Sequence, residues 1–216
     1  MEHKFKAVAL LAAWLLSANT AQASHISVGT CLVYDNVPNV TRSSDANLFA
    51  TTAACNTNPI NYVIVAVPTV HDTPNGYGTP ANSGNYNPIT VDFNTAGYAT
   101  WSGTMAWAQY LDGINYLGHY TWMQPTTYVQ TCSGYNCTNS TLNELFYTGL
   151  SGVAGTSITT THKSSYGHVQ NSGYWFGTKY AANLDFAWYF YTDIGYQDAS
   201  YKVGYILYSW DVLSGE

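Results

Sequence analysis

The chain has 216 residues, of which 8% are charged and 16% are aromatic, and its formal net charge is −6. Disordered chains are rich in charge and poor in aromatic residues, so this composition indicates a folded protein. The six lysines and arginines are too few for a basic stripe, so neither nucleic acid nor an anionic membrane is expected as a partner.

The first residues have the features of a secretory signal peptide. Lys4 and Lys6 precede an apolar run over residues 7–16, and Ala21-Gln22-Ala23 has the form of a cleavage site. The alternative, a transmembrane anchor, needs about 20 apolar residues, roughly twice this run. We therefore expect residues 1–23 to be removed after Sec export. One domain of residues 24–216, with no transmembrane anchor, would then be extracellular, periplasmic or at the cell surface.

Four cysteines follow the expected cleavage site: Cys31, Cys55, Cys132 and Cys137. An even number in an exported chain predicts two disulfides, and three pairings are open. The short spacing favours Cys132–Cys137, with Cys31–Cys55 paired by default. A redox or metal role for the closely spaced pair is the alternative. No further Cys or His completes a tetrahedral set beside it, so no metal site is expected.

In chain order, strands are expected over 27–34 and over 62–67, where a β-branched run is typical of a buried strand. A long loop over 71–95 follows, rich in Gly, Pro and Asn. A helix is expected to begin after Thr100 as its N-cap and to end at Gly113. A shorter helix begins near Thr141, where Thr141 and Glu144 have capping-box spacing. Two further loops are expected over 125–140 and 155–172.

The last third of the chain predicts strands with aromatic side chains. In the segment 187–191 the period of two places Trp188 and Phe190 on one face and Tyr189 and Tyr191 on the other. Trp175 and Trp188 are expected in the core, and a final strand is expected over 201–210. Exposed tyrosines can stack on sugar rings or pack against protein. The predicted ligand-binding residues are therefore Tyr180, Tyr189, Tyr191 and Tyr196, unless a second layer covers them.

Several short motifs occur in a fixed order along residues 30–212. They include Leu32-Val33-Tyr34-Asp35-Asn36, Thr121-Trp122-Met123-Gln124-Pro125, Glu144-Leu145-Phe146-Tyr147 and Gly195-Tyr196-Gln197. Together they resemble the Lcl C-terminal domain family, the tail of a bacterial collagen-like adhesin, and within it the branch that often carries a PEP-CTERM sorting tail.

That resemblance implies an α+β, C-type-lectin-like fold, with two helices packed on twisted antiparallel strands. It also implies binding at a cell surface, with glycan adhesion for the named member. The chain departs from the family pattern in segments 122–125 and 210–213, where the family usually has an arginine and this chain has none. Any buried ion pair that these arginines form is therefore lost here.

Catalytic signatures are absent from the sequence. It has no Gly-x-Ser-x-Gly elbow, phosphate loop, His-Glu-x-x-His motif or calcium loop. The five histidines beyond the signal do not pair at ligand spacing; they are His25, His71, His119, His162 and His168. The carboxylates Asp185, Asp193, Asp198 and Asp211 are expected to be turn residues, although paired carboxylates beside aromatics also occur in glycosidases.

We therefore expect a non-enzymatic binding domain, with no catalytic residues, no metal and no cofactor, whose partner is a glycan or a surface protein. One alternative is a structural matrix or envelope module that self-associates as a homo-oligomer. A glycan-active enzyme is the other.

Overall fold

The computed structural model describes residues 25–73, 76–78, 80–128, 130–158 and 165–215. The expected signal peptide, with its cleavage site, and His162 lie outside these residues. Among the helices described, none is both long and apolar enough to cross a membrane.

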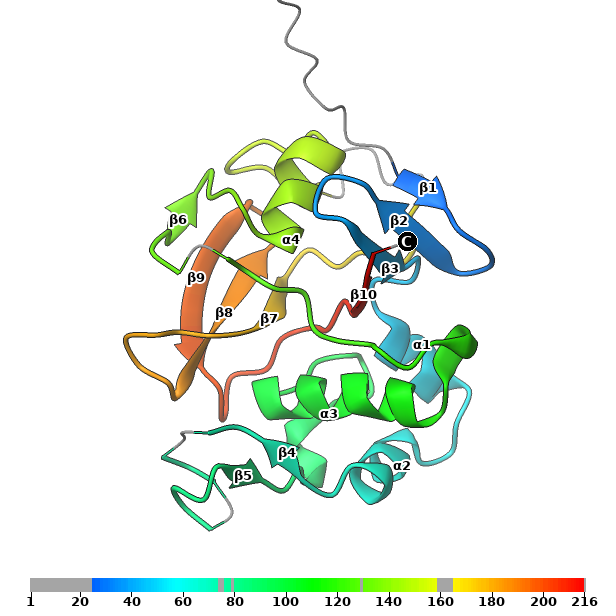
Figure 1. The fold of residues 1–216 in the computed structure, drawn as a ribbon, viewed down its shortest axis with the longest axis vertical. Helices are drawn as coiled ribbons and strands as arrows, with labels where there is room; N and C mark the ends of the chain where they lie inside the picture. The colour runs from blue at the N-terminus through cyan, green and yellow to red at the C-terminus, as the bar shows by residue number, and fades with distance from the viewer. Residues whose placement is uncertain (1–24, 74–75, 79, 129, 159–164, 216) are drawn as a thin grey trace, which may run out of the picture.

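The first sheet brings the two ends of the described chain together. It contains β1 (His25–Ser27), β2 (Leu32–Asp35), β3 (Val40–Ser43) and β10 (Val212–Ser214), in the order β1-β2-β3-β10. All three pairs are antiparallel, and β10 lies against β3 with Val212 opposite Arg42. In Figure 1 the C-terminal strand accordingly lies beside the blue N-terminal strands.

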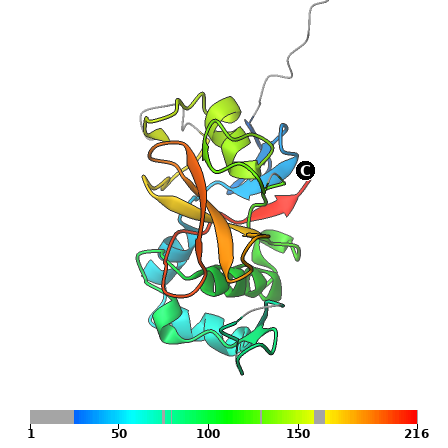
Figure 2. The ribbon, with the colours of Figure 1, turned by 90° about the vertical axis from the view of Figure 1, so that its left-hand side faces the viewer.

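The second sheet carries the aromatic part of the chain. It contains β7 (Gly173–Lys179), β8 (Phe186–Tyr191), β9 (Tyr196–Tyr201) and the short β6 (Gly134–Tyr135), in the order β6-β9-β8-β7. All of its pairs are antiparallel. Figure 2 views this sheet from its β9 side, with β9 crossing in front of β8.

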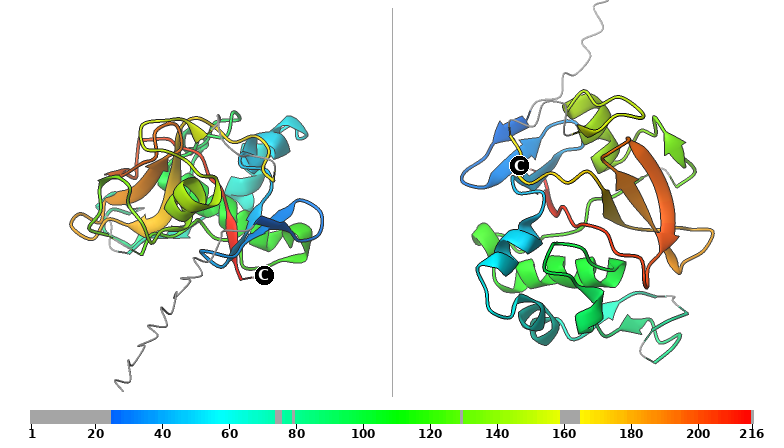
Figure 3. Two further views of the ribbon diagram at one scale, coloured as in Figure 1. Left: turned by 90° about the horizontal axis from the view of Figure 1, so that it is seen from above. Right: turned by 180° about the vertical axis from the view of Figure 1, so that it is seen from behind.

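The helices lie beside and between these sheets (Figures 1 and 3). They are α1 (Leu48–Ala54), α2 (Pro59–Ala66), α3 (Trp101–Gly113) and α4 (Thr141–Asn143), which continues into the π-helix η3 (Glu144–Gly149). Shorter elements are β4 (Val70–His71), β5 (Asn85–Tyr86) and the 3-10 turns η1 (Thr90–Asp92) and η2 (Tyr116–Gly118). Helices together with antiparallel sheets confirm the α+β class.

Local signals predicted the longest helix well. The Thr100 side chain accepts a hydrogen bond from the backbone N–H of Gly103 at 3.1 Å, as an N-cap does, and α3 ends at Gly113. The second helix begins one residue earlier than its capping-box spacing indicated. Its N-cap is Ser140, whose hydroxyl accepts from the N–H of Asn143 at 3.2 Å.

The strand expected over 62–67 is wrong, because these residues belong to α2 and to its C-terminal cap. Pro59 occupies the first turn of this helix, where its fixed φ is already helical. Within α2 only Val63 is buried, so the apolar run does not lie in the interior of a sheet. A short β-branched run cannot distinguish a buried strand from a helix by periodicity alone.

The two other predicted strands are also corrected. Residues 27–34 contain the end of β1 and the start of β2, separated by a turn. Residues 201–210 lie mostly between β9 and β10, and their strand-like pairing consists of isolated bridges from Leu207 to Ala99 and from Tyr208 to Tyr174. The later part of this connection is buried, because Leu207, Tyr208 and Trp210 enter the core. The loop expected over 71–95 also contains β4, β5 and η1.

One face of the second sheet packs against the helix that follows Ser140. Its aromatic side chains are Tyr174, Phe176, Trp188 and Phe190, and they meet Leu142, Leu145 and Phe146 in one buried cluster. Trp175 and Trp188 are both buried, as predicted. The opposite face carries Tyr189, Tyr191 and Tyr196.

Candidate functional site

Strand pairing brings three of the four predicted binding residues to one face of the second sheet. Tyr191 lies opposite Tyr196, and Tyr189 lies opposite Asp198, in the antiparallel ladder of β8 and β9. Residues directly opposite each other point to the same face, and so do residues two apart on one strand. Tyr189, Tyr191 and Tyr196 therefore share a face.

Tyr180 does not join them. It packs edge-on against Trp188, with ring centroids 5.1 Å apart, in the cluster on the other side of the sheet. The chain leaves β7 at Lys179 and turns before β8 begins at Phe186, which places Tyr180 on that side.

Two further tyrosines complete the group. Tyr135 of β6 meets Tyr196 edge-on, with ring centroids 5.0 Å apart. The Tyr205 hydroxyl lies 2.6 Å from that of Tyr191, and the Tyr205 ring lies 6.0 Å from Tyr189. We call the five rings the tyrosine face: Tyr135, Tyr189, Tyr191, Tyr196 and Tyr205.

The expectation that Tyr189 is exposed is wrong. It is only 7% exposed, because Trp175, Leu207 and Trp101 pack in the same cluster and cover the ring. Tyr191, Tyr196 and Tyr205 are half-buried, and Tyr135 is 48% exposed. Tyr189 therefore forms the floor of the tyrosine face, and its more open rings lie toward β9 and β6.

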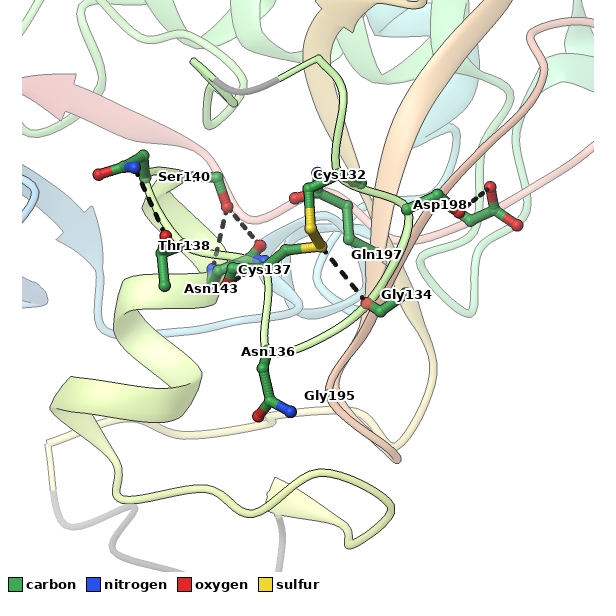
Figure 4. Close-up of a disulfide and its surroundings, with 12 residues drawn as sticks. Cys132, Gly134, Asn136, Cys137, Thr138, Ser140, Asn143, Gly195, Gln197 and Asp198 are labelled. Carbon is green, nitrogen blue, oxygen red and sulfur yellow. Dashed lines mark hydrogen bonds between the residues drawn. A yellow bond between two sulfur atoms is a disulfide. The ribbon is translucent and has the colours of Figure 1, made fainter.

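The disulfide loop holds Tyr135 beside β9. The structure contains the Cys132–Cys137 disulfide, as the spacing predicted. The Gln197 side chain donates to the carbonyl of Cys132 at 2.9 Å, and the Ser133 hydroxyl donates to Asp198 at 3.0 Å. Figure 4 shows the disulfide and Asp198 on neighbouring segments, with Gln197 between them.

The expected Cys31–Cys55 disulfide is wrong, because both cysteines are free and exposed. Cys31 stands just before β2, where its carbonyl accepts from the N–H of Ser44. Cys55 ends α1, and its N–H donates back to Thr52. The backbone of each cysteine is therefore held by hydrogen bonds to other residues. The sequence supports this pairing only by elimination, since these two cysteines remain after Cys132 and Cys137 are paired.

Asp198 is the carboxylate of the tyrosine face. Its Oδ1 atom accepts hydrogen bonds from the Ser133 hydroxyl at 3.0 Å and from the N–H of Ala199 at 2.9 Å. Burial, and then the charge of Asp198, raise the pKa of Tyr189 above its usual value. Burial and the hydrogen bond with Tyr205 raise the pKa of Tyr191 in the same way. Both phenols therefore stay neutral at physiological pH and keep hydroxyl groups that can donate hydrogen bonds.

The other three carboxylates considered for a glycosidase have different surroundings. Asp185 accepts from the N–H of Gly76 at 2.8 Å, at the rim of a polar cavity of about 430 Å³ near the 181–185 turn. Asp211 is buried and accepts from the side chain of Gln124. Asp193 lies in the turn between β8 and β9. Among the described lining residues of that cavity none is aromatic, so it does not resemble the predicted site.

The histidines do not build a metal centre within the described part of the chain, where no group of three or more His, Cys, Asp and Glu residues could hold a metal ion. His168 pairs with Asp45 at 3.0 Å, and His25 lies 3.7 Å from Asp35. Each of these two histidines therefore lies beside a single carboxylate.

Sequence reasoning missed Tyr135 and Tyr205, and it treated Asp198 only as a turn residue. Period-two alternation assigns sides within one strand, whereas these residues reach the site through pairing between distant segments. The one signal for Tyr135 was its place between Cys132 and Cys137, since a short disulfide loop fixes the residues that it encloses.

Comparison of the chain with family models, with curated proteins and with solved structures gives no match.

Proposed function

We propose that this chain is an exported, non-enzymatic binding domain that recognises carbohydrate at the tyrosine face. The observation that carries the proposal is the convergence of five tyrosines and one carboxylate on a single sheet face. Phenol rings offer flat apolar surfaces to sugar rings, and neutral hydroxyl groups and a carboxylate can bond to sugar hydroxyls. Tyrosine also loses little conformational entropy on binding, because its side chain has only two torsions.

The resemblance to the Lcl C-terminal domain family supports the same proposal. That family implies a C-type-lectin-like arrangement and glycan adhesion, and the α+β architecture is compatible with it. The signal-like N-terminal segment supports export, and the Cys132–Cys137 disulfide is what an oxidising compartment allows. We propose a calcium-independent site, because the described residues contain no group of three or more His, Cys, Asp and Glu side chains that could hold a metal ion.

A glycan array probed with the exported chain tests this function. We expect binding that persists in the presence of a chelator and is lost when Tyr135 and Tyr196 are both replaced by Ala. Tyr120→Ala is the matched control, because Tyr120 is 67% exposed and follows η2, outside the strands of the second sheet. Equal binding by the Tyr135→Ala/Tyr196→Ala and Tyr120→Ala variants would contradict the proposed site. Release of cleaved glycan would contradict the non-enzymatic part of the proposal.

Self-association as a structural module is the second candidate, and a separate surface favours it. Four apolar side chains on α2 and around η1 are at least 48% exposed: Tyr62, Val65, Ile89 and Val91. A contiguous exposed apolar patch commonly marks a protein interface. Analytical ultracentrifugation tests this candidate: a concentration-dependent oligomer that Val65→Asp disrupts would support it, and a monomer at all concentrations would remove it.

A further inference from the structure

The tyrosine face carries a negative charge that no side chain of the described residues neutralises. Asp198 uses its Oδ1 atom to hold Ser133 and Ala199, whereas its Oδ2 atom makes no hydrogen bond or ion pair with any described residue. The side chain is only partly buried, so this second oxygen remains available to a ligand.

The basic residues of the described chain are engaged elsewhere. Arg42 lies 3.6 Å from Asp35 in the first sheet, and Lys179 and Lys202 both pair with Asp72, at 2.6 and 2.9 Å. Within the described residues the tyrosine face therefore has a carboxylate and no cation. A sulfated or carboxylated ligand would meet repulsion there.

Tyr189 places the floor of the tyrosine face next to the carboxylate. Its side chain is 7% exposed, because Trp101, Trp175 and Leu207 cover the ring. Tyr189 lies directly opposite Asp198 in the ladder, so its side chain shares a face with the carboxylate. Asp193 and Asp198 also act together on Tyr191, where both charges help to raise its pKa after burial and the Tyr205 hydrogen bond.

A carboxylate beside the rings of several tyrosines suits a positively charged group. The face of a phenol ring attracts a cation, and a carboxylate forms its strongest hydrogen bonds with a charged N–H donor. A metal ion does not fit here, because the described residues supply no set of three ligands.

We infer that the carbohydrate bound at the tyrosine face carries protonated primary amines, as in a polymer of amino sugars that lack their N-acetyl groups. This inference rests on the proposed function and narrows its substrate class. Sugar rings would pack on Tyr135 and Tyr196, and an ammonium group would bond to the free oxygen of Asp198.

Titration calorimetry with three soluble hexamers tests the inference on the exported chain. The probes are hexamers of glucosamine, of N-acetylglucosamine and of glucose. We expect the glucosamine hexamer to bind roughly tenfold tighter than the others at about pH 6, the scale of one charge-assisted hydrogen bond. The preference should disappear at about pH 9, above the usual pKa of an α-amino group, where the amines are neutral.

Two variants make the test specific. Asp198→Asn keeps an acceptor oxygen for Ser133 and Ala199 but removes the charge, so it should abolish the preference for glucosamine over glucose. Asp185→Asn changes the net charge equally at a distant turn and should preserve the preference.

The possible outcomes separate this inference from the proposed function. Equal binding of all three hexamers, unaltered by Asp198→Asn, would overturn the inference and leave carbohydrate recognition intact. Binding of none of the three would overturn both. Equal loss of preference in both Asp variants would show that overall charge, and not Asp198, selects the ligand, which also overturns the inference.

Discussion

Asp211 is a buried carboxylate whose described hydrogen-bond donors are neutral side chains. The Gln124 amide donates to its Oδ1 atom at 2.6 Å and the Ser209 hydroxyl donates at 2.8 Å. Burial raises the pKa of Asp211 to about 7, and the hydrogen bond from Ser209 only partly opposes that shift.

This pKa predicts a pH-dependent stability. Between the unfolded pKa, about 4, and the folded value the native state holds the Asp211 proton more tightly than the unfolded chain does. The resulting stabilisation is complete below about pH 4 and is lost as pH rises through about 7. The effect is on the order of a few kcal/mol, since each pKa unit corresponds to about 1.4 kcal/mol.

Urea unfolding at several pH values checks this prediction. Asp211→Asn should remove a large part of the loss of stability between about pH 5 and pH 8. Parallel curves for the wild type and the variant would show that Asp211 is not the group responsible.

Lys202 is the second residue with a predictable energetic role. Its ammonium group donates to both oxygens of Asp72, at 2.9 and 3.0 Å, and to the carbonyl of Leu184 at 2.6 Å. The ammonium also lies 4.3 Å from the centre of the Trp101 ring. It thereby joins the segment after β4 to the end of β9.

We predict that Lys202→Ala destabilises the fold by about 3–5 kcal/mol, because it removes the fully buried ammonium group that pairs with the Asp72 carboxylate. Lys179, whose side chain is 26% exposed, is the other lysine that pairs with Asp72, and Lys179→Ala removes that pair. It should cost about 1 kcal/mol or less, as partly exposed ion pairs usually do. Chemical denaturation of both variants measures the difference, and equal losses would contradict this assignment.

Residue-level expectations succeeded where a single strand decides the outcome. Alternation placed Trp188 in the core and Tyr189 on the opposite face, and both placements are correct. It could not predict that Trp175, Leu207 and Trp101 would cover Tyr189, because all three residues come from other segments of the chain. The same limit hid Tyr135 and Tyr205.

Among the elements, β6 lies inside the loop closed by the Cys132–Cys137 disulfide, and we expect this loop to position Tyr135. The disulfide closes a loop with a sequence separation of only five, so the chain-entropy model gives about 2 kcal/mol of stabilisation. Its larger effect should be on position, because β6 pairs with β9 only through Gly134 and Tyr135.

Replacing both Cys132 and Cys137 by Ser tests this role. We predict a loss of about 2 kcal/mol or less in unfolding free energy and a much larger proportional loss of glycan binding. Denaturation and calorimetry on the same sample separate the two effects. A variant that binds normally would show that the loop does not need the disulfide to present Tyr135.

Elements with strong end signals were predictable, and those defined by context were not. Thr100 and Gly113 gave the bounds of α3 because caps act within one turn. The run in α2 was misassigned because its burial depends on α3, which the run itself does not reveal. The segment 201–210 was misassigned because its aromatic side chains are buried without strand pairing.

For the molecule as a whole, we expect the net charge to influence which ligands can approach. The chain has a net charge of −6, and its described basic residues are paired with carboxylates. We predict no binding to heparin-like sulfated polymers at physiological salt, because like charges repel over a Debye length of about 8 Å. Surface plasmon resonance on immobilised heparin checks this, and a saturable response would contradict it.

We propose that the tyrosine face is the binding surface of the molecule. An NMR titration of the chain with its best array ligand, following ring signals of specifically labelled tyrosines, tests this directly. We expect the signals of Tyr135, Tyr191 and Tyr196 to shift together and saturate, while that of Tyr120 does not move. Saturating shifts confined to tyrosines outside the tyrosine face would contradict it.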